Sequence, residues 1–266
     1  MALIYNATFD SQTRVLSLLD KAGNVISSCE VPSKELVDDP NKPLMFRAIE
    51  DNSSVALKMN GGNTTNTYQT STNGTDWTDY TFGTKISLNN GESVYFRCSK
   101  HLTTQSSTFY VHFSMTGKIE AWHNAYSMIS SSFTNTGDSV GYYGMCSLFE
   151  YCSSLTKAPL LLNAISSYCY RCTFRKCSSL TKAPALPAAT LEIGCYANMF
   201  DGCRSLKEVR VSATKTAKDA LSLWLSGVSP TGDFYCDPNA TIFPKGSSEG
   251  IPADWRRLNI NDYPQT

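Results

Sequence analysis

The segment that decides the fold is Phe149-Glu-Tyr-Cys-Ser-Ser-Leu-Thr-Lys-Ala-Pro159, which recurs as Phe174-Arg-Lys-Cys-Ser-Ser-Leu-Thr-Lys-Ala-Pro184. A third, more divergent copy begins at Phe200 and continues through Cys203 and Leu206. The three phenylalanines lie 25 and 26 residues apart. Self-similarity at a period in the twenties predicts a solenoid, in which each coil buries its apolar side chains only by stacking on the next coil.

The copies share two columns of cysteine: Cys152, Cys177 and Cys203 form one, and Cys169 and Cys195 form the other. Free cysteine behaves as a small buried hydrophobe. Side chains in register on neighbouring parallel strands stand about 4.8 Å apart and point the same way, whereas a disulfide needs converging Cβ atoms about 3.8 Å apart. We therefore expect mostly free thiols in the columns. Four further cysteines receive no role from the repeats: Cys29, Cys98, Cys146 and Cys236.

The chain before the repeats is typical of short antiparallel strands. Residues 1–31 predict a small β segment with a hairpin turn at Gly23-Asn24, and residues 32–43, with three prolines, predict a linker. Residues 44–140 predict an antiparallel β-sandwich, because short apolar runs alternate with glycine- and asparagine-rich turns. The expected strands are 44–49, 54–59, 67–71, 77–81, 85–88, 93–98, 108–115 and 118–122.

The chain after the repeats is expected to cap them. Apolar residues at Ala217, Ala220, Leu221, Trp224 and Leu225 have helical spacing, and a glycine follows at the predicted stop, so we expect a short amphipathic helix and then irregular cover. The predicted fold is therefore mainly β. Its expected parts are an N-terminal β attachment segment (1–31), a linker (32–43), a β-sandwich (44–140), leucine-rich repeats (141–212) and a C-terminal helical or irregular cap (213–266).

Charge and hydropathy exclude several classes of protein. The chain has 23 Lys and Arg against 23 Asp and Glu, which argues against a nucleic-acid binder that relies on bulk positive charge. Residues 141–210 nevertheless hold eight basic and four acidic residues, so the repeats are mildly basic. No apolar run approaches the length of a membrane span, and the first residues lack the pattern of a secretory signal.

Positions at which the copies differ are expected to lie on the surface. The residues after each phenylalanine share no character, and two tyrosines stand beside the second cysteine column. The candidate recognition strip, for which an ordinary solvated face is the alternative, comprises Tyr151, Arg175, Lys176, Asp201, Tyr170 and Tyr196.

The sequence holds no pattern that indicates catalysis or metal binding. Cys169-Tyr-Arg-Cys172 is a lone pair without the second pair or histidine that would complete a zinc site. His101, His112 and His123 lack a partner nucleophile or carboxylate motif, so each is expected to be structural. We expect no enzyme activity, no cofactor and no metal.

The pattern Phe-x-x-Cys-Ser-Ser-Leu-Thr-Lys-Ala-Pro-x-Leu-Pro resembles the BspA-like (Treponema-type) leucine-rich repeats. The variant from Cys195-Tyr to Cys203 is similar to repeats of gut Bacteroidales and their phage fibre proteins, and the stretches beginning at Trp224 and Gly250 resemble the ending that follows such repeats. The resemblance covers residues 141–258. It implies a surface-exposed adhesion or recognition module without catalytic residues.

This resemblance leads us to expect a non-enzymatic virion protein: a phage head or tail fibre or a capsid decoration, assembled in the host cytoplasm and released by lysis. Expected partners are further copies in a trimer or dimer, other virion proteins through the N-terminal segment, and a host surface glycan or protein. We expect no nucleic acid and no membrane span. The alternatives are a bacterial BspA-like adhesin at the cell surface and a polysaccharide depolymerase, which would need two carboxylates facing each other in a cleft.

Overall fold

The computed structural model describes residues 4, 6–10, 15–30, 36–61, 67–99, 105–132, 140–162 and 165–264. The described chain is mainly β, with several separate sheets and two short 3-10 helices, η1 (Ala125–Met128) and η2 (Ile260–Asp262). It divides into two compact units, Met1–Val37 and Asp38–Thr266. The boundary between the units falls inside the segment that the sequence predicts as a linker.

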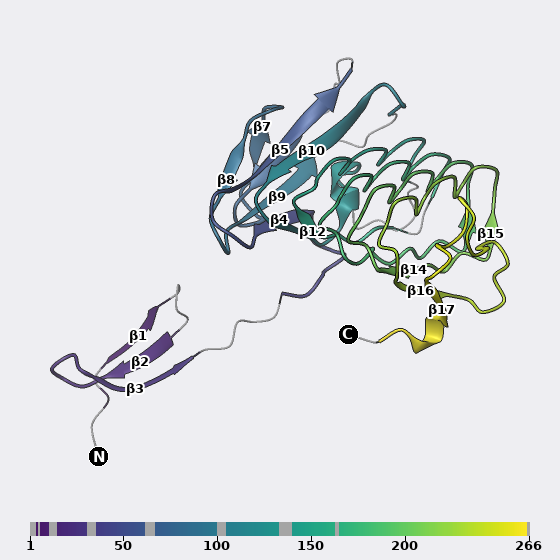
Figure 1. Cartoon of the computed structure of the whole chain (residues 1–266). Coiled ribbons are helices and arrows are strands. Elements are labelled where there is room, and N and C mark those ends of the chain that lie inside the picture. Colours follow the sequence, from purple (N-terminus) through teal and green to yellow (C-terminus); the bar gives the residue numbers. More distant parts are fainter. Residues whose placement is uncertain are drawn as a thin grey trace. The chain divides into compact units, whose positions relative to one another are not determined.

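The first unit is a three-stranded antiparallel sheet with the order β1-β2-β3 (Figure 1). Its strands are β1 (Asn6–Asp10), β2 (Val15–Leu19) and β3 (Val25–Glu30). The predicted hairpin turn is confirmed: Gly23 adopts φ 85°, and the Asp20 carboxylate accepts hydrogen bonds from the N–H groups of Ala22 and Asn24. The first strand is described from Asn6 onward, whereas Leu3 and Tyr5 of the apolar run before it lie outside the described residues.

The second unit opens with eight strands, and each of the eight predicted between residues 44 and 122 is confirmed with small shifts at its ends. They are β4 (Met45–Ala48), β5 (Ser53–Asn60), β6 (Tyr68–Ser71), β7 (Thr78–Tyr80), β8 (Ile86–Leu88), β9 (Ser93–Cys98), β10 (Tyr110–Thr116) and β11 (Ile119–Trp122). They form one sheet of order β10-β5-β8 and one of order β12-β11-β4-β9-β6-β7. The second sheet also includes β12 (Leu155–Lys157), which runs parallel to β11 and belongs to the first repeat.

An aromatic core joins these two sheets to the repeats. Phe46 lies 4.6 Å from Phe113 and 5.7 Å from Phe96, measured between ring centroids, with the rings packed edge to face. Phe113 also stacks on Phe149 at 5.6 Å. The first phenylalanine of the repeats therefore completes the core of the antiparallel sheets, which ties the two regions together.

The repeats form four similar turn-rich segments, 143–151, 168–176, 194–202 and 219–227, which lie side by side (Figure 1). In each of the first three segments the N–H groups of alternate residues donate to carbonyls 24 or 25 residues further along the chain. The first, fifth and ninth residues have left-handed backbone conformations. These positions are Tyr143, Ser147, Tyr151, Tyr168, Cys172, Lys176, Gly194, Asn198, Gly202, Asp219, Leu223 and Gly227.

The fourth of these segments replaces the amphipathic helix predicted over residues 217–225, so that prediction is wrong. Its residues form turns, and Ala220 and Trp224 accept hydrogen bonds through their carbonyls from the N–H groups of Tyr196 and Phe200. The left-handed residues return every four positions, so buried side chains also return every four positions. This spacing resembles the 3.6-residue period of a helix, which explains the wrong prediction.

The opposite side of the repeats is built from short parallel strands. These are β12, already described, β13 (Thr190–Leu191), β14 (Glu208–Arg210), β15 (Lys215–Thr216), β16 (Asp233–Cys236) and β17 (Arg256–Asn259). Strand β14 pairs with β16, and β16 with β17, all in parallel. The tail was expected to be irregular, but two of its segments extend this sheet and bury Phe234 and Trp255.

Equivalent residues of successive segments form the predicted apolar columns. The rings of Phe149, Phe174 and Phe200 stack nearly parallel at centroid distances of 5.3 and 5.6 Å. Beside them, the thiols of Cys177 and Cys203 donate to the carbonyls of Phe149 and Phe174. The cysteine column therefore serves as a set of buried spacers that also satisfies backbone acceptors.

All ten cysteines lie in the described chain as free thiols, and nine of them are buried. Burial raises the pKa of Cys172 to about 11 and that of Cys195 to about 12, so both thiols stay protonated at neutral pH. Five cysteines lie outside the two columns, and Cys172 is one of the buried ones. Cys98, Cys146 and Cys236 are buried, whereas Cys29 is exposed on β3.

Candidate functional site

Arg175 and Asp201 of the predicted recognition strip form a ladder of ion pairs with Glu150 across the repeats. Arg175 Nη1 lies 3.1 Å from Glu150 Oε1, and Arg175 Nε lies 3.0 Å from Asp201 Oδ2. The hydrogen bond to Asp201 raises the pKa of Arg175 further above its usual value. Glu150 and Asp201 keep only 11% and 18% of their side-chain surface exposed. The ladder joins three segments, and its single arginine is shared between two carboxylates, which leaves one net negative charge among the three groups.

Two further members of the strip remain accessible. Tyr151 is 65% exposed, and Lys176 is half-buried with its aliphatic stem over Gly202. Both residues have positive φ angles, 63° in each case, because they close the ninth position of their segments. The structure thus places Tyr151 and Lys176 at the rim of the stack, beside the ion-pair ladder.

Tyr170 and Tyr196 are not surface residues, which corrects the sequence-based expectation for both. Their exposed fractions are 0% and 1%, and burial raises the pKa of each phenol well above its usual value. The Tyr170 hydroxyl donates to the carbonyl of Leu162 at 3.1 Å. Each tyrosine follows a column cysteine within the tight turns, and that position turns its ring toward the interior of the stack.

Sequence reasoning missed a groove of about 480 Å³ on the strand side of the repeats. Its walls come from the Thr-Lys-Ala-Pro motifs of the first two repeats, from Arg210 on β14, and from Tyr263 and Asp38. The two motifs are identical, so a search confined to positions at which the copies differ does not include them. A lysine at the same position of both copies was the available signal, because a charged side chain is almost never buried without a partner.

The charges of this groove are only partly paired. Lys157 Nζ lies 2.6 Å from Asp38 Oδ2, and Lys182 Nζ lies 2.8 Å from Glu208 Oε1. Arg210 packs its guanidinium over the ring of Tyr263 at 4.8 Å and has no carboxylate within ion-pair distance in the described chain. Three cations therefore face two carboxylates, and the free positive charge is that of Arg210.

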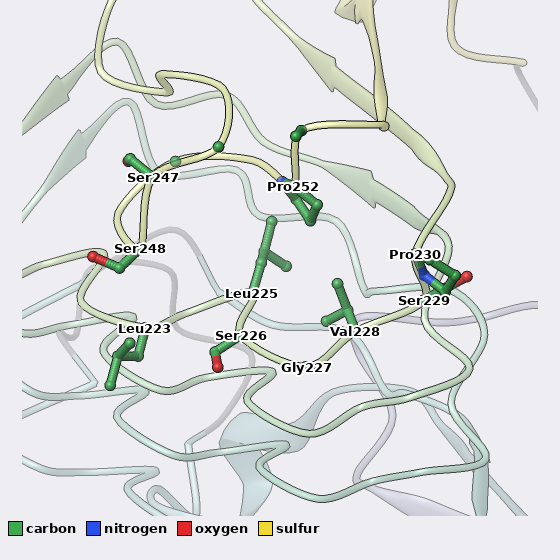
Figure 2. Close-up of a pocket in the computed structure, with 13 residues that line it drawn as sticks. Leu223, Leu225, Ser226, Gly227, Val228, Ser229, Pro230, Ser247, Ser248 and Pro252 are labelled. Atoms are coloured by element: carbon green, nitrogen blue, oxygen red, sulfur yellow. The ribbon is translucent and has the colours of Figure 1, made fainter.

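A second hollow, of about 420 Å³, lies at the far end of the stack (Figure 2). Figure 2 shows Leu225 of the last segment and Val228, just after it, facing the loop that carries Ser247 and Pro252. By the repeat pattern, the N–H groups of Leu223 and Gly227 would donate to a next segment, but among the described residues they have no acceptor. The ladder of hydrogen bonds thus ends here with donors exposed to solvent.

The histidines in the described chain have structural surroundings, whereas His101 lies outside the described residues. His123 Nδ1 accepts a hydrogen bond from the backbone N–H of Asp39, and the backbone N–H of His123 donates to the Asp38 carboxylate. Burial lowers the pKa of His123, and the charge of Asp38 opposes that effect. Burial likewise lowers the pKa of His112. Within the described ranges, no cluster of three or more His, Cys, Asp or Glu side chains could hold a metal ion.

Comparisons with protein-family models, with curated proteins and with solved structures gave no match to this chain. In the part of the chain that the structure describes, no helix has both the length and the apolar character needed to cross a membrane.

Proposed function

We propose that this protein is a non-enzymatic recognition module of a virion, a phage fibre or capsid decoration, in which a short BspA-like leucine-rich-repeat solenoid with a C-terminal cap displays a ligand-binding groove. Three features support the proposal: the repeat motif resembles adhesion repeats, equivalent residues stack in columns as in a solenoid, and a separate small β unit precedes the second unit. In this proposal, the first unit attaches the module to the particle.

The observation that carries the recognition role is Arg210 in the groove. Its guanidinium carbon lies over the ring of Tyr263, 4.8 Å from the ring centroid, without an ion-pair partner in the described chain, and a planar fork of donors suits a carboxylate, sulfate or phosphate group. The groove carries one more positive than negative charge. The proposed ligand is therefore an anionic group on a host or mucosal glycan or protein.

Ion pairing of the carboxylates near the groove argues against a depolymerase. Asp233 is engaged by Arg256 through two hydrogen bonds, and Glu208 pairs with Lys182 and accepts from the Tyr263 hydroxyl. A glycosidase needs one carboxyl group that stays protonated and a second that is free to act as base or nucleophile. Carboxylates held by arginine and lysine suit neither role.

Binding of the full chain to mucin, measured by biolayer interferometry, tests the recognition role. Wild-type protein should bind native mucin and lose that binding once sialic acid and sulfate are removed. Arg210→Ala should weaken binding about tenfold or more, because a charge-assisted hydrogen-bonded contact contributes about 1.5–3 kcal/mol. Arg210→Lys should recover only part of the affinity, because it restores the charge without the fork.

Lys215→Ala is the matched control, because Lys215 is an exposed cation on β15 outside the groove. Equal loss of binding in Lys215→Ala and Arg210→Ala would show that only bulk charge matters and would contradict the groove. The location is tested separately by mass spectrometry of purified phage particles. Particles without this chain would contradict the virion assignment, and recovery of the chain from a bacterial cell envelope instead would favour the adhesin.

A further inference from the structure

The fourth segment of the stack carries a row of N–H donors that repeats the pattern of the earlier segments. In the third segment, the N–H groups of alternate residues donate to carbonyls of the fourth, as that of Phe200 does to the carbonyl of Trp224. The fourth segment has the same left-handed positions as the third, so its own alternate N–H groups face onward along the stack. These donors, which have no acceptor among the described residues, include Leu223, Leu225 and Gly227.

All three donors belong to residues that line the hollow of about 420 Å³ at the far end of the stack (Figure 2). Leu225 is only 5% exposed, and a backbone N–H in so buried a residue is almost always paired in native proteins. The walls of the hollow are apolar residues, glycines and serines, and none of the described side chains that line it is charged. The hollow therefore suits a ligand that brings hydrogen-bond acceptors without a strong charge.

The opposite end of the stack shows how such a row is completed in this protein. In the first segment, the carbonyls of Gly144 and Leu148 occupy the acceptor positions of the pattern. The carbonyl of Leu148 accepts from the N–H of Phe113 in strand β10 at 2.8 Å, and that of Gly144 accepts from Gln105 Nε2 at 2.7 Å. That end is thus closed by polypeptide from outside the repeats, and the rows between segments are closed by polypeptide as well.

We propose that the end hollow binds an extended segment of a partner protein, whose carbonyls accept hydrogen bonds from Leu223, Leu225 and Gly227. The segment would extend the stack by one row, as a peptide strand adds to the open edge of a sheet. Small, uncharged side chains suit the lining of the hollow. Two copies of this end cannot pair symmetrically, because donors would face donors. The hollow shares no lining residue with the groove around Arg210, so the proposal is independent of the recognition role.

Amide exchange of the full chain, followed residue by residue by NMR, tests the proposal with a peptide probe. The probe is a synthetic peptide of residues 218–228, because this segment already presents carbonyls at the required spacing to the third segment. Saturating peptide should slow exchange at Leu223, Leu225 and Gly227 several-fold, because new hydrogen bonds must open before exchange. Unchanged exchange at these three amides would overturn the proposal. Slow exchange at all three in the chain alone would overturn it too, because the donors would then already have acceptors.

Two matched variants locate the binding. Ala253→Trp places a bulky side chain at an exposed residue that lines the hollow, whereas Thr241→Trp places it at an exposed residue that does not. Ala253→Trp should abolish the slowing by peptide, and Thr241→Trp should keep it, with the same thermal unfolding in both variants and the wild type. Equal responses of the two variants would contradict binding in the hollow. Slowing by maltoheptaose, a neutral oligosaccharide, without slowing by peptide would overturn the peptide as occupant.

Discussion

The antiparallel sheets of residues 45–122 and the stacked segments of residues 143–227 bury their side chains by different rules. In the sheets, strand β9 alternates buried and half-buried positions every two residues, as pleated strands do. In the stack, a side chain is buried because the equivalent residue of the next segment covers it, as Phe200 covers Phe174. The sheets thus depend on local alternation, whereas the stack depends on repetition across about 25 residues. The destabilisation caused by a substitution should therefore extend to different neighbouring elements in the two regions.

The largest expected effect comes from the junction of the two regions. Phe149 touches the rings of both Phe113 and Phe174, so its side chain belongs to both cores. Phe149→Ala should lower the free energy of unfolding of the second unit by about 3–5 kcal/mol, from lost burial and the cavity left behind. Urea unfolding followed by near-ultraviolet circular dichroism measures this loss.

Phe200→Ala makes the same chemical change further from the sheets. Phe200 stacks on Phe174 and, among the described residues, makes no ring contact with the sheet region. Because each segment contacts only its neighbours, faster amide exchange should be confined to the segments around residues 194–227. Equal loss of protection in strands β4 and β9 after Phe200→Ala would show that the two regions do not differ in this way.

A smaller effect is expected where a glycine begins a stacked segment. Gly194 has φ +60°, and a Cβ atom added there would lie 2.3 Å from Cε1 of Tyr168. Gly194→Ala should lower stability by about 1–2 kcal/mol, because backbone strain and crowding add together. Gly83→Ala in the sheet region is the control: Gly83 has φ +82° with open space around it, so it reports the strain alone. If Gly83→Ala lowers stability as much as Gly194→Ala does, crowding against the neighbouring segment makes no contribution, which would contradict this prediction.

Ion pairs in the two regions should also differ in their contributions to stability, although these contributions are smaller. Arg175 links three segments and should contribute about 1 kcal/mol to stability, less at high salt, because its side chain is 34% exposed. Lys118 in the sheet region pairs with Glu50 at 3.6 Å and is 62% exposed, so Lys118→Ala should change stability by a few tenths of a kcal/mol at most. Thermal unfolding of both variants at two salt concentrations checks this ranking.

The smallest effect is a pH dependence centred on His123. Its pKa is lowered in the folded state, mainly by burial, so its contribution to stability is complete above the unfolded value near 6.5 and is lost as the pH falls. His123→Asn keeps a residue type that tolerates the φ of 66° found there. The wild type should therefore lose more stability than the variant between pH 7.5 and pH 5. Parallel curves for the two proteins would contradict a role for His123.

The difference between the regions also explains what the sequence could predict. Two-residue alternation and glycine turns are local signals, and all eight strands of the sheets were predicted from them. The columns of Phe149 and Cys152 followed from the long period. The helix predicted around Trp224 failed because four-residue turns produce nearly the same spacing as a helix. The groove around Arg210 could not be predicted, because it combines residues from repeats, linker and tail that only the fold brings together.

Amide hydrogen exchange at single-residue resolution tests most directly whether the repeated segments form one continuous stack that ends at the fourth. The N–H groups of Tyr196, Phe200 and Gly202 donate to the carbonyls of the fourth segment, whereas those of Leu223 and Gly227 have no acceptor in the described chain. Exchange should therefore be slow at the first three positions and fast at the last two, since an amide without an acceptor at an open end has no protecting hydrogen bond to break. Equal protection at all five positions would contradict the account, and so would fast exchange at Phe200.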